Sequence, residues 1–205
     1  MARMSPDDRR MAIVVATRAV MARQGIGGTT VRDVAAELGT SSGLIHHYYD
    51  SMDDLVAAAF EQAAREDLMV TREAVEQGVS PIERLVLFFD TYARGEDGSG
   101  MQLWLDAWAE AARRPALQRI SRRLNEEWQR LLAGIIREGV AAREMACDDP
   151  DAAAWRLLSL LDGLTLQVVA HGDVMSMRDA DTWARAGAER ELALRAGLLS
   201  PTLAR

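Results

Sequence analysis

The sequence predicts an all-α protein of about nine helices, and three observations support this fold class. Apolar residues recur at steps of three and four in one segment after another, as they do on one face of a helix. No segment shows the apolar-polar alternation, bounded by turn residues, that is typical of a strand. Helix-capping residues at one boundary and glycine or proline at the other divide the chain into pieces of helix length.

The first helix is expected to begin at Asp7 or Asp8 and to end at Gly25. Its apolar face comprises Met11, Val14, Val15, Ala19, Val20 and Met21. A glycine after the last apolar position is the usual helix terminator. We expect this helix to brace the segment that follows it.

Residues 29–55 combine two short helices and a tight turn. Thr30 and Asp33 form a capping-box pattern at the start of the first helix. Its apolar face comprises Val31, Val34, Ala35 and Leu38. Gly39 follows the last apolar position and can adopt the left-handed conformation that ends a helix. The spacing therefore predicts a helix-turn-helix.

The second short helix can begin almost at once, because Ser41 or Ser42 can cap it. The residues that hold it against the core are expected to be Leu44, Ile45, Tyr48 and Tyr49. Those left pointing outward are Ser42, Gly43, His46 and His47. Small and hydrogen-bonding side chains on an exposed helix suit the major groove of DNA. Two short helices joined by a glycine turn also occur in other all-helical proteins, so spacing alone leaves both interpretations open.

The residue types of this segment resemble the DNA-binding domain of the TetR family of transcriptional regulators. The matching pattern is Gly-x-Gly-Gly, Thr-Thr-Val-Arg-Asp-Val-Ala, Leu-Gly, Ser-x-Gly-x-Ile and two aromatic residues. The resemblance implies that the residues contacting DNA are Thr30, Arg32, Ser41, Ser42, Gly43, Leu44, His46, His47 and Tyr48. Two departures are visible: His46 and Tyr48 exchange the order usual in the family, and Met52 stands where the family commonly has a lysine for the DNA backbone.

The charge distribution is compatible with a DNA-binding head on an acidic body. The net charge of −7 divides into +1 for residues 1–50 and −8 for residues 51–205. The chain contains no lysine, so arginine must supply every cationic contact to phosphate, and hydroxyls, backbone N–H groups and helix N-termini supply the rest. We expect modest non-specific affinity for DNA.

The rest of the chain is read as a separate helical body. Ser51 with Asp54 opens a helix of roughly 26 residues, about 40 Å long, because neither glycine nor proline interrupts the chain before Gly78. A Ser80-Pro81 start with Glu83 opens the next, and residues 94–100 form the clearest loop. Further helices are expected at residues 101–114, from Pro115 for nearly 30 residues, from Asp148-Asp149-Pro150 onward and from Ser176 onward. The expected domains are residues 1–50 for DNA binding and residues 51–205 for ligand binding and dimerisation.

The body resembles the regulatory domain of the BetI-type branch of the same family. The residues that carry this resemblance are Leu103-Trp104, Trp108-Ala-Glu110-Ala, Pro115-x-Leu117, Trp128, Arg137-Glu138-Gly139 and Asp162-Gly163-Leu164. The regulator after which the branch is named responds to choline, but a resemblance to the branch does not transfer the identity of the ligand.

Aromatic residues are concentrated on the helices of the body. Such residues are most often core, but together they could line a cavity between helices, and an aromatic wall with a carboxylate would suit a cation. The candidate ligand-binding residues are Phe89, Tyr92, Met101, Trp104, Trp108, Trp128 and Asp162.

Two late helices are expected to form a dimer interface. Between residues 155 and 169 the apolar residues cover more of the helix than one core-facing stripe requires, so we expect burial on two sides. The last helix carries small residues that permit close approach, and two copies of both helices could form a four-helix bundle. The predicted interface residues are Leu157, Leu161, Leu164, Val168, Ala184, Ala188 and Leu192.

Other classes of site find little support. The single Cys147 cannot form an internal disulfide, which favours a cytoplasmic setting, and no stretch of about 18 uninterrupted apolar residues indicates a membrane span. The adjacent His46 and His47 point about 100° apart on a helix and cannot chelate one metal. The acidic pairs Glu126-Glu127 and Asp148-Asp149 suit solvated faces or helix caps better than catalytic dyads. We therefore expect no catalytic residue, and we also expect no metal and no cofactor.

The sequence as a whole predicts a homodimeric, ligand-responsive transcriptional regulator, a repressor that binds a pseudo-palindromic operator and is released by a small molecule. One alternative is an all-α ligand-binding or enzymatic protein that has lost DNA binding, supported by the acidic charge and the missing lysines. A second alternative is a regulator that uses no small ligand. The effector, the operator sequence, the regulated genes and the sign of regulation are left open.

Overall fold

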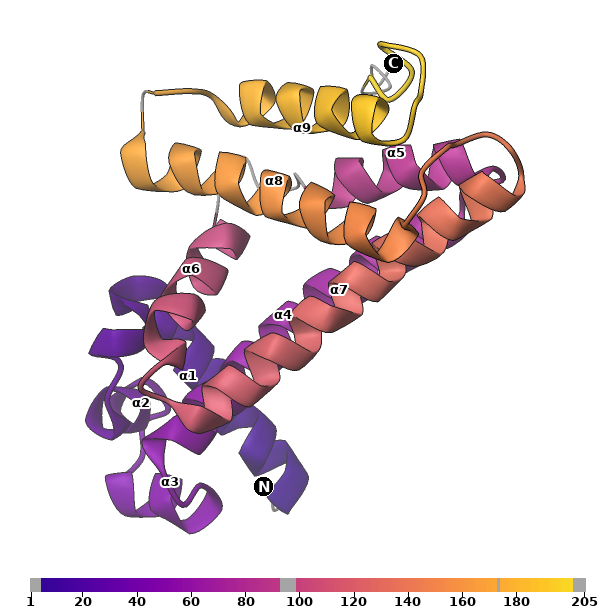
Figure 1. Cartoon of the computed structure of the whole chain (residues 1–205). Helices are drawn as coiled ribbons and strands as arrows, with labels where there is room; N and C mark the ends of the chain where they lie inside the picture. The colour runs from indigo at the N-terminus through magenta and orange to yellow at the C-terminus, as the bar shows by residue number, and fades with distance from the viewer. Residues whose placement is uncertain (1–4, 93–98, 173, 201–205) are drawn as a thin grey trace. The chain divides into compact units, whose positions relative to one another are not determined.

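The computed structural model describes residues 5–92, 99–172 and 174–200, and within these residues the chain forms α-helices and no strand (Figure 1). The helices are α1 (Pro6–Gly28), α2 (Val31–Glu37), α3 (Ser42–Tyr48), α4 (Met52–Glu76), α5 (Pro81–Tyr92), α6 (Ser99–Ala111), α7 (Pro115–Ala141), α8 (Pro150–His171) and α9 (Met177–Glu191). The expected all-α class and the number of helices are confirmed. Of the loop expected at residues 94–100, residues 94–98 lie outside the described part of the chain, and α6 already begins at Ser99.

Helix starts follow the capping patterns of the sequence. At α9, Ser176 accepts a hydrogen bond from the Asp179 N–H at 3.1 Å, and the Asp179 carboxylate accepts one from the Ser176 N–H at 3.0 Å. Helix α1 begins slightly earlier than expected, at Pro6, because Ser5 caps it. Gly25 adopts φ +76° and interrupts α1 where its end was expected, and one more helical turn follows.

The chain divides into two compact units. The first comprises Met1–Glu66 and Gln102–Leu124, and the second comprises Asp67–Met101 and Asn125–Arg205. Helices α4 and α7 contribute residues to both units. The domain boundary expected at residue 50 stays a prediction.

The core of the first unit joins its three N-terminal helices. A buried cluster holds α1, α2, α3 and the start of α4 together; its members are Ile13, Ala16, Val20, Val34, Ala35, Ile45 and Leu55. Each of its valine, leucine and isoleucine side chains contributes about 1.5–3 kcal/mol on transfer from water. Val31, Leu38 and Met52 pack against the cluster from its edges.

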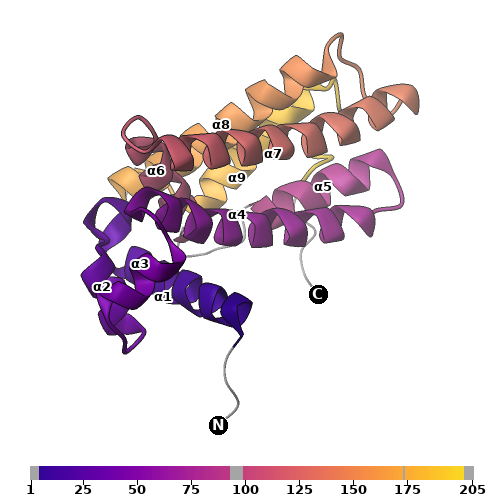
Figure 2. The same cartoon turned by 90° about the horizontal axis from the view of Figure 1, so that it is seen from below.

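In the second unit, α8 and α9 lie side by side (Figures 1 and 2). Their close approach depends on Gly187, because a Cβ at this position would lie 2.5 Å from Cδ2 of Leu160. A buried arginine, Arg185, ties α9 to its neighbours: it donates hydrogen bonds to Asp90 on α5 at 2.7 Å and to Asp181 at 2.8 Å. Its guanidinium carbon also lies 5.3 Å from the centre of the Phe89 ring.

Helix α8 is the one described helix that is long and apolar enough to cross a membrane by length and composition. A core helix of a soluble protein passes the same test, so this property is weak evidence for a membrane. The expectation that the chain has no membrane partner stays a prediction.

Candidate DNA-binding surface and ligand site

Helices α2 and α3 form the expected helix-turn-helix. Thr30 caps α2 with Asp33, as predicted, and Gly39 adopts φ +65° after its last turn. Ser41 caps α3 and accepts a hydrogen bond from the Leu44 N–H at 3.4 Å. Only the segment 38–41 separates the two helices, so the turn has the short length that the spacing indicated.

Helix α3, the candidate recognition helix, packs one face on the core, and its other face is exposed to solvent. Ile45 is buried in the core cluster, and Tyr48 and Tyr49 pack against it. The residues that the sequence assigned to DNA are all exposed or half-buried; Ser41, Gly43, His46 and His47 are exposed, and Ser42, Leu44 and Tyr48 are half-buried. The structure therefore leaves room for a duplex along the predicted face.

Besides capping α2, the Thr30 side chain bonds the Asp33 side chain directly. Its hydroxyl donates to the Asp33 carboxylate at 2.6 Å. Hydrogen bonds from Thr30 and Gln24 lower the pKa of Asp33, so this carboxylate is ionised at neutral pH. A hydroxyl has one proton to donate, so a phosphate contact from Thr30 would require its hydroxyl to leave Asp33.

The arginines of the first unit differ in how free they are. Arg18 pairs with Glu66 at 2.7 Å, and Arg23 pairs with Glu37 at 2.6 Å. The other described arginines between residues 5 and 50 have no ion pair in this part of the chain; they are Arg9, Arg10 and Arg32. Among the described residues 5–50, the guanidinium groups of these three arginines are not engaged by a carboxylate.

Arg10 is a candidate that sequence reasoning missed. Its guanidinium carbon lies 6.0 Å from the centre of the Tyr48 ring, so this α1 side chain reaches the end of α3. Nothing in the local sequence signals this contact, because Arg10 and Tyr48 are separated by the whole of α2 and meet only in the tertiary fold.

In the second unit, an ionisable pair lies among aromatic rings. The Tyr92 hydroxyl on α5 donates a hydrogen bond to Oδ1 of Asp162 on α8. The Trp128 ring of α7 lies 5.5 Å from the Tyr92 ring, edge to face. Phe88 stacks on Tyr92 at 6.0 Å and meets Trp128 at 5.9 Å. Of the candidate ligand residues, the structure therefore brings Tyr92, Trp128 and Asp162 together, and Phe88 joins them.

Burial dominates the electrostatics of this pair. It raises the pKa of Asp162 to about 6, although the hydrogen bond from Tyr92 acts in the opposite direction. Burial and the neighbouring carboxylate also raise the pKa of Tyr92 well above its usual range. At pH 7 the pair therefore consists of a neutral phenol and a carboxylate that is largely ionised and has no cationic partner among the described residues.

The other four ligand candidates are Trp104, Trp108, Phe89 and Met101. Trp104 and Trp108 belong to the first unit, where Trp104 packs edge to face on Phe60 at 4.9 Å and lies 5.6 Å from Trp108. Phe89 is fully buried; its ring centre lies 6.0 Å from that of Phe88 and 5.3 Å from the guanidinium carbon of Arg185. Met101 is half-buried near the start of α6.

Most of the predicted dimer residues are buried within the protomer. Five of them are buried inside the chain itself and can offer little surface to a partner: Leu157, Leu161, Ala184, Ala188 and Leu192. They pack within the protomer because α8 and α9 lie against each other. Leu164 and Val168 are half-buried, and the exposed large apolar residues of these two helices are Trp155, Leu160, Leu166 and Trp183.

No cluster of three or more metal-ligand side chains occurs among the described residues. Cys147 is half-buried, and burial together with the nearby Glu191 carboxylate raises the pKa of its thiol, which disfavours the reactive thiolate. These features define a class of protein: an all-helical chain in which an N-terminal helix-turn-helix is followed in the sequence by a helical body.

Comparison with known proteins identifies the family. Residues 13–59 match the description "Bacterial regulatory proteins, tetR family", and residues 81–193 match "BetI-type transcriptional repressor, C-terminal". The HTH-type transcriptional regulator BetI of Cronobacter sakazakii is 29% identical over 185 residues, which cover 85% of this chain and 86% of the relative. The chain belongs to the TetR family of transcriptional regulators and has a BetI-type C-terminal domain.

Solved structures agree with this assignment. A transcriptional regulator from Pseudomonas aeruginosa PAO1 superposes with a TM-score of 0.79 at 30% identity, covering 92% of both chains. A regulator from Saccharomonospora viridis, crystallised in complex with choline, shares the fold with a TM-score of 0.82 at 24% identity, covering 91% of this chain and 98% of the other. The chain is accordingly a DNA-binding transcriptional regulator.

Proposed function

We propose that this regulator is a cytoplasmic repressor that binds a pseudo-palindromic operator as a homodimer and releases it when a small organic cation binds the second unit. The observation that carries the ligand class is the Asp162 carboxylate, which accepts a hydrogen bond from Tyr92, whose ring packs against Trp128 and Phe88. An organic cation gains from aromatic faces and from a carboxylate that has no other cation beside it. The choline complex of the S. viridis regulator is consistent with this ligand class.

DNA recognition is assigned to the exposed face of α3. We propose that Ser42, His46 and His47 reach base edges, and that Arg9, Arg10 and Arg32 contact phosphates and set the register. Met52 has no charge with which to contact a phosphate. Arg10 can supply this contact instead, because its guanidinium lies beside the C-terminal end of the recognition helix.

Dimerisation is assigned to the outer faces of α8 and α9. Their exposed apolar residues Trp155, Leu166 and Trp183, together with half-buried Leu164 and Val168, give a surface that we propose a two-fold axis pairs with itself. Burial of this surface also explains why α8 is apolar on more sides than the fold of one protomer requires.

Release of DNA is assigned to helix α4. Its N-terminal turns belong to the first unit and its later turns to the second, so a shift of α4 changes the placement of the recognition helix. Two recognition helices must lie about 34–36 Å apart to enter successive major grooves, so a ligand that favours another spacing weakens operator binding.

Choline is a suitable first probe for the proposed cation site. We expect saturable binding by calorimetry, with a loss of at least about tenfold in Asp162→Asn, because the charge is removed while the amide oxygen can still accept the Tyr92 hydrogen bond. Tyr92→Phe, which keeps the ring and the carboxylate, is the matched control and should still bind. Equal choline affinity in the wild type and Asp162→Asn would contradict the proposed site.

A further inference from the structure

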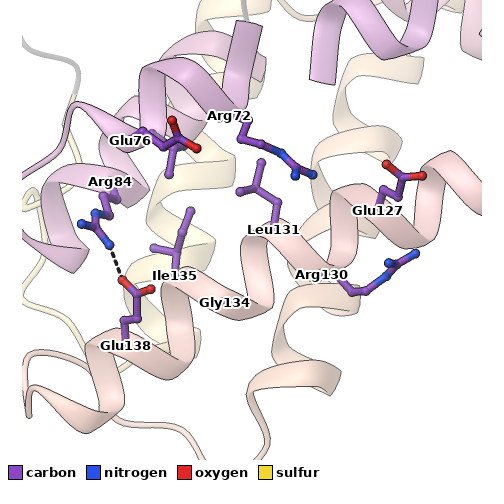
Figure 3. Close-up of a pocket in the computed structure, with 10 residues that line it drawn as sticks. Arg72, Glu76, Arg84, Glu127, Arg130, Leu131, Gly134, Ile135 and Glu138 are labelled. Atoms are coloured by element: carbon purple, nitrogen blue, oxygen red, sulfur yellow. Dashed lines mark hydrogen bonds and ion pairs between the residues drawn. The ribbon is translucent and has the colours of Figure 1, made fainter. Parts of the chain in front are cut away.

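A groove in the second unit lies between α4 and α7, with a contribution from the start of α5 (Figure 3). Its volume is about 570 Å³, which falls within the range of about 300–1,000 Å³ that is usual for small-molecule sites. None of the residues of the Tyr92–Asp162 pair lines it. The groove is therefore a second place where a ligand could bind.

A glycine keeps this groove open. Gly134 lies inside helix α7, where glycine is less favourable than alanine. A Cβ at Gly134 would meet no heavy atom within 4 Å, so no neighbour requires the side chain to be absent. Gly139 on the same helix is different, because a Cβ there would lie 2.4 Å from Sδ of Met145. Packing explains Gly139, whereas at Gly134 the position of a missing side chain is open space in the groove.

The charges of the groove are distributed unevenly along it. In Figure 3, Arg72 of α4 and Arg130 of α7 lie toward one end, and the ion pair of Arg84 with Glu138 lies toward the other. Arg72 and Arg130 have no ion pair in the described part of the chain, and only Nε of Arg130 is engaged, by a backbone carbonyl at 3.1 Å. Two guanidinium groups are therefore available at one end.

Two of the three acidic residues that line the groove are already engaged. Glu138 is paired with Arg84, and Glu127, which lies toward the arginine end, has an interaction of its own. Glu76 is exposed. Between the charged ends the wall is apolar; it is formed by Val75, Leu131 and Ile135.

We propose that this groove binds an amphipathic anion, a molecule with one carboxylate or phosphate group on an apolar chain. The acid group lies between Arg72 and Arg130, where guanidinium groups can form charge-assisted hydrogen bonds with its oxygens. The apolar chain lies over Gly134 against Leu131 and Ile135. This site is independent of the cation site, and neither requires the other.

Decanoate below its micelle concentration is the probe, titrated into the full chain by calorimetry. We expect saturable binding to the wild type and a loss of at least about tenfold in the double variant Arg72→Gln/Arg130→Gln, because both charge-assisted contacts are removed. Arg137→Gln is the matched control: it removes an arginine from the same helix that pairs with Asp151 and does not line the groove. Its affinity should stay within about twofold of the wild type, as a charge that is not in contact predicts.

Two substitutions at Gly134 test the space itself. A Cβ at Gly134 meets no neighbour, so Gly134→Leu should extend its side chain into the groove and abolish decanoate binding while circular dichroism shows an intact helical fold. Gly134→Ala leaves most of the groove empty, so this variant should still bind decanoate. The substitution itself should raise the melting temperature of the protein. Decanol, which has no charge, should bind at least about tenfold more weakly than decanoate.

The proposal is overturned by any of four results. These are no saturable decanoate binding at millimolar concentration, unchanged affinity in the double arginine variant, unchanged affinity in Gly134→Leu, and equal affinity for decanol. Tighter binding of decyltrimethylammonium than of decanoate would refute the claim that the groove prefers an anion. A failure of the choline experiment at Asp162 leaves these outcomes unaffected, so the two sites are tested separately.

Discussion

Removing the charge of Arg10 is expected to change how operator affinity depends on salt. Three arginines per protomer, Arg9, Arg10 and Arg32, are free to neutralise phosphates in the described part of the chain between residues 5 and 50. A dimer then neutralises about six phosphates, and each contributes about −0.9 to the slope of log K against log salt. We expect a slope of about −5 for the wild type. Arg10→Gln should reduce its magnitude to about 3.6, because two of the six contacts are lost.

Fluorescence anisotropy of a labelled operator duplex at several salt concentrations measures both slopes. The variant should weaken binding to operator and to random duplex by similar factors, because phosphate contacts position the protein and do not read sequence. Arg18→Gln is the matched control, since Arg18 is already paired with Glu66 in the same unit and should leave the slope nearly unchanged. A slope that is identical for the wild type and Arg10→Gln would refute the assignment of Arg10 to DNA.

Four further outcomes follow from the geometry. His47→Ala and Ser42→Ala should each weaken operator binding by about 1–3 kcal/mol and leave random DNA nearly unaffected, and equal losses on both duplexes would mean that the faces of α3 are reversed. Folding raises the pKa of Asp162 from 3.8 to about 6, so as pH rises the unfolded chain loses this proton before the folded chain does. The free energy of unfolding should therefore fall by up to about 3 kcal/mol between pH 4 and pH 6. Chemical denaturation measures this fall, which should be absent in Asp162→Asn. Choline affinity should change in the opposite direction and strengthen as pH rises through about 6, and an affinity that does not depend on pH would contradict binding to the ionised carboxylate. Arg185→Met should destabilise the fold by about 3–5 kcal/mol, because Asp90 and Asp181 lose a buried partner, and a loss below about 1 kcal/mol in urea denaturation would show that the network is not a stabilising one.

The parts of the fold that depend on local chemistry could be predicted from the sequence. Capping boxes at Thr30 and Ser176 placed helix starts to the residue, because each cap involves side chains only three positions apart. Gly39 could likewise be assigned to the turn, since only a residue that tolerates positive φ suits that position.

The parts that depend on tertiary packing could not be predicted. Leu161 and Ala188 have the apolar and small character expected of a dimer interface, but the same character serves the packing of α8 on α9 within one protomer. Periodicity identifies an apolar face and does not identify what covers it. The contact of Arg10 with Tyr48 and the groove around Gly134 likewise join segments that are distant in the sequence.

The candidate ligand site shows the same division. Tyr92, Trp128 and Asp162 have side chains whose chemistry suits a cation, and the structure brings these three together from α5, α7 and α8. Trp104 and Trp108 have the same aromatic chemistry but belong to the first unit. Residue type indicated which side chains could bind a cation, and only the packing of the helices determines which of them meet.

Quantitative footprinting of the DNA upstream of the regulator's own gene, with and without choline, tests the central claim most directly. A homodimeric, cation-responsive repressor should protect two half-sites about 34–36 Å apart, and choline should weaken that protection roughly 5–150-fold, the range of a coupling free energy of about 1–3 kcal/mol. Asp162→Asn should protect the same half-sites and should not respond to choline. A wild-type titration curve that choline leaves unchanged, or the absence of any protected pair of half-sites, would contradict the account.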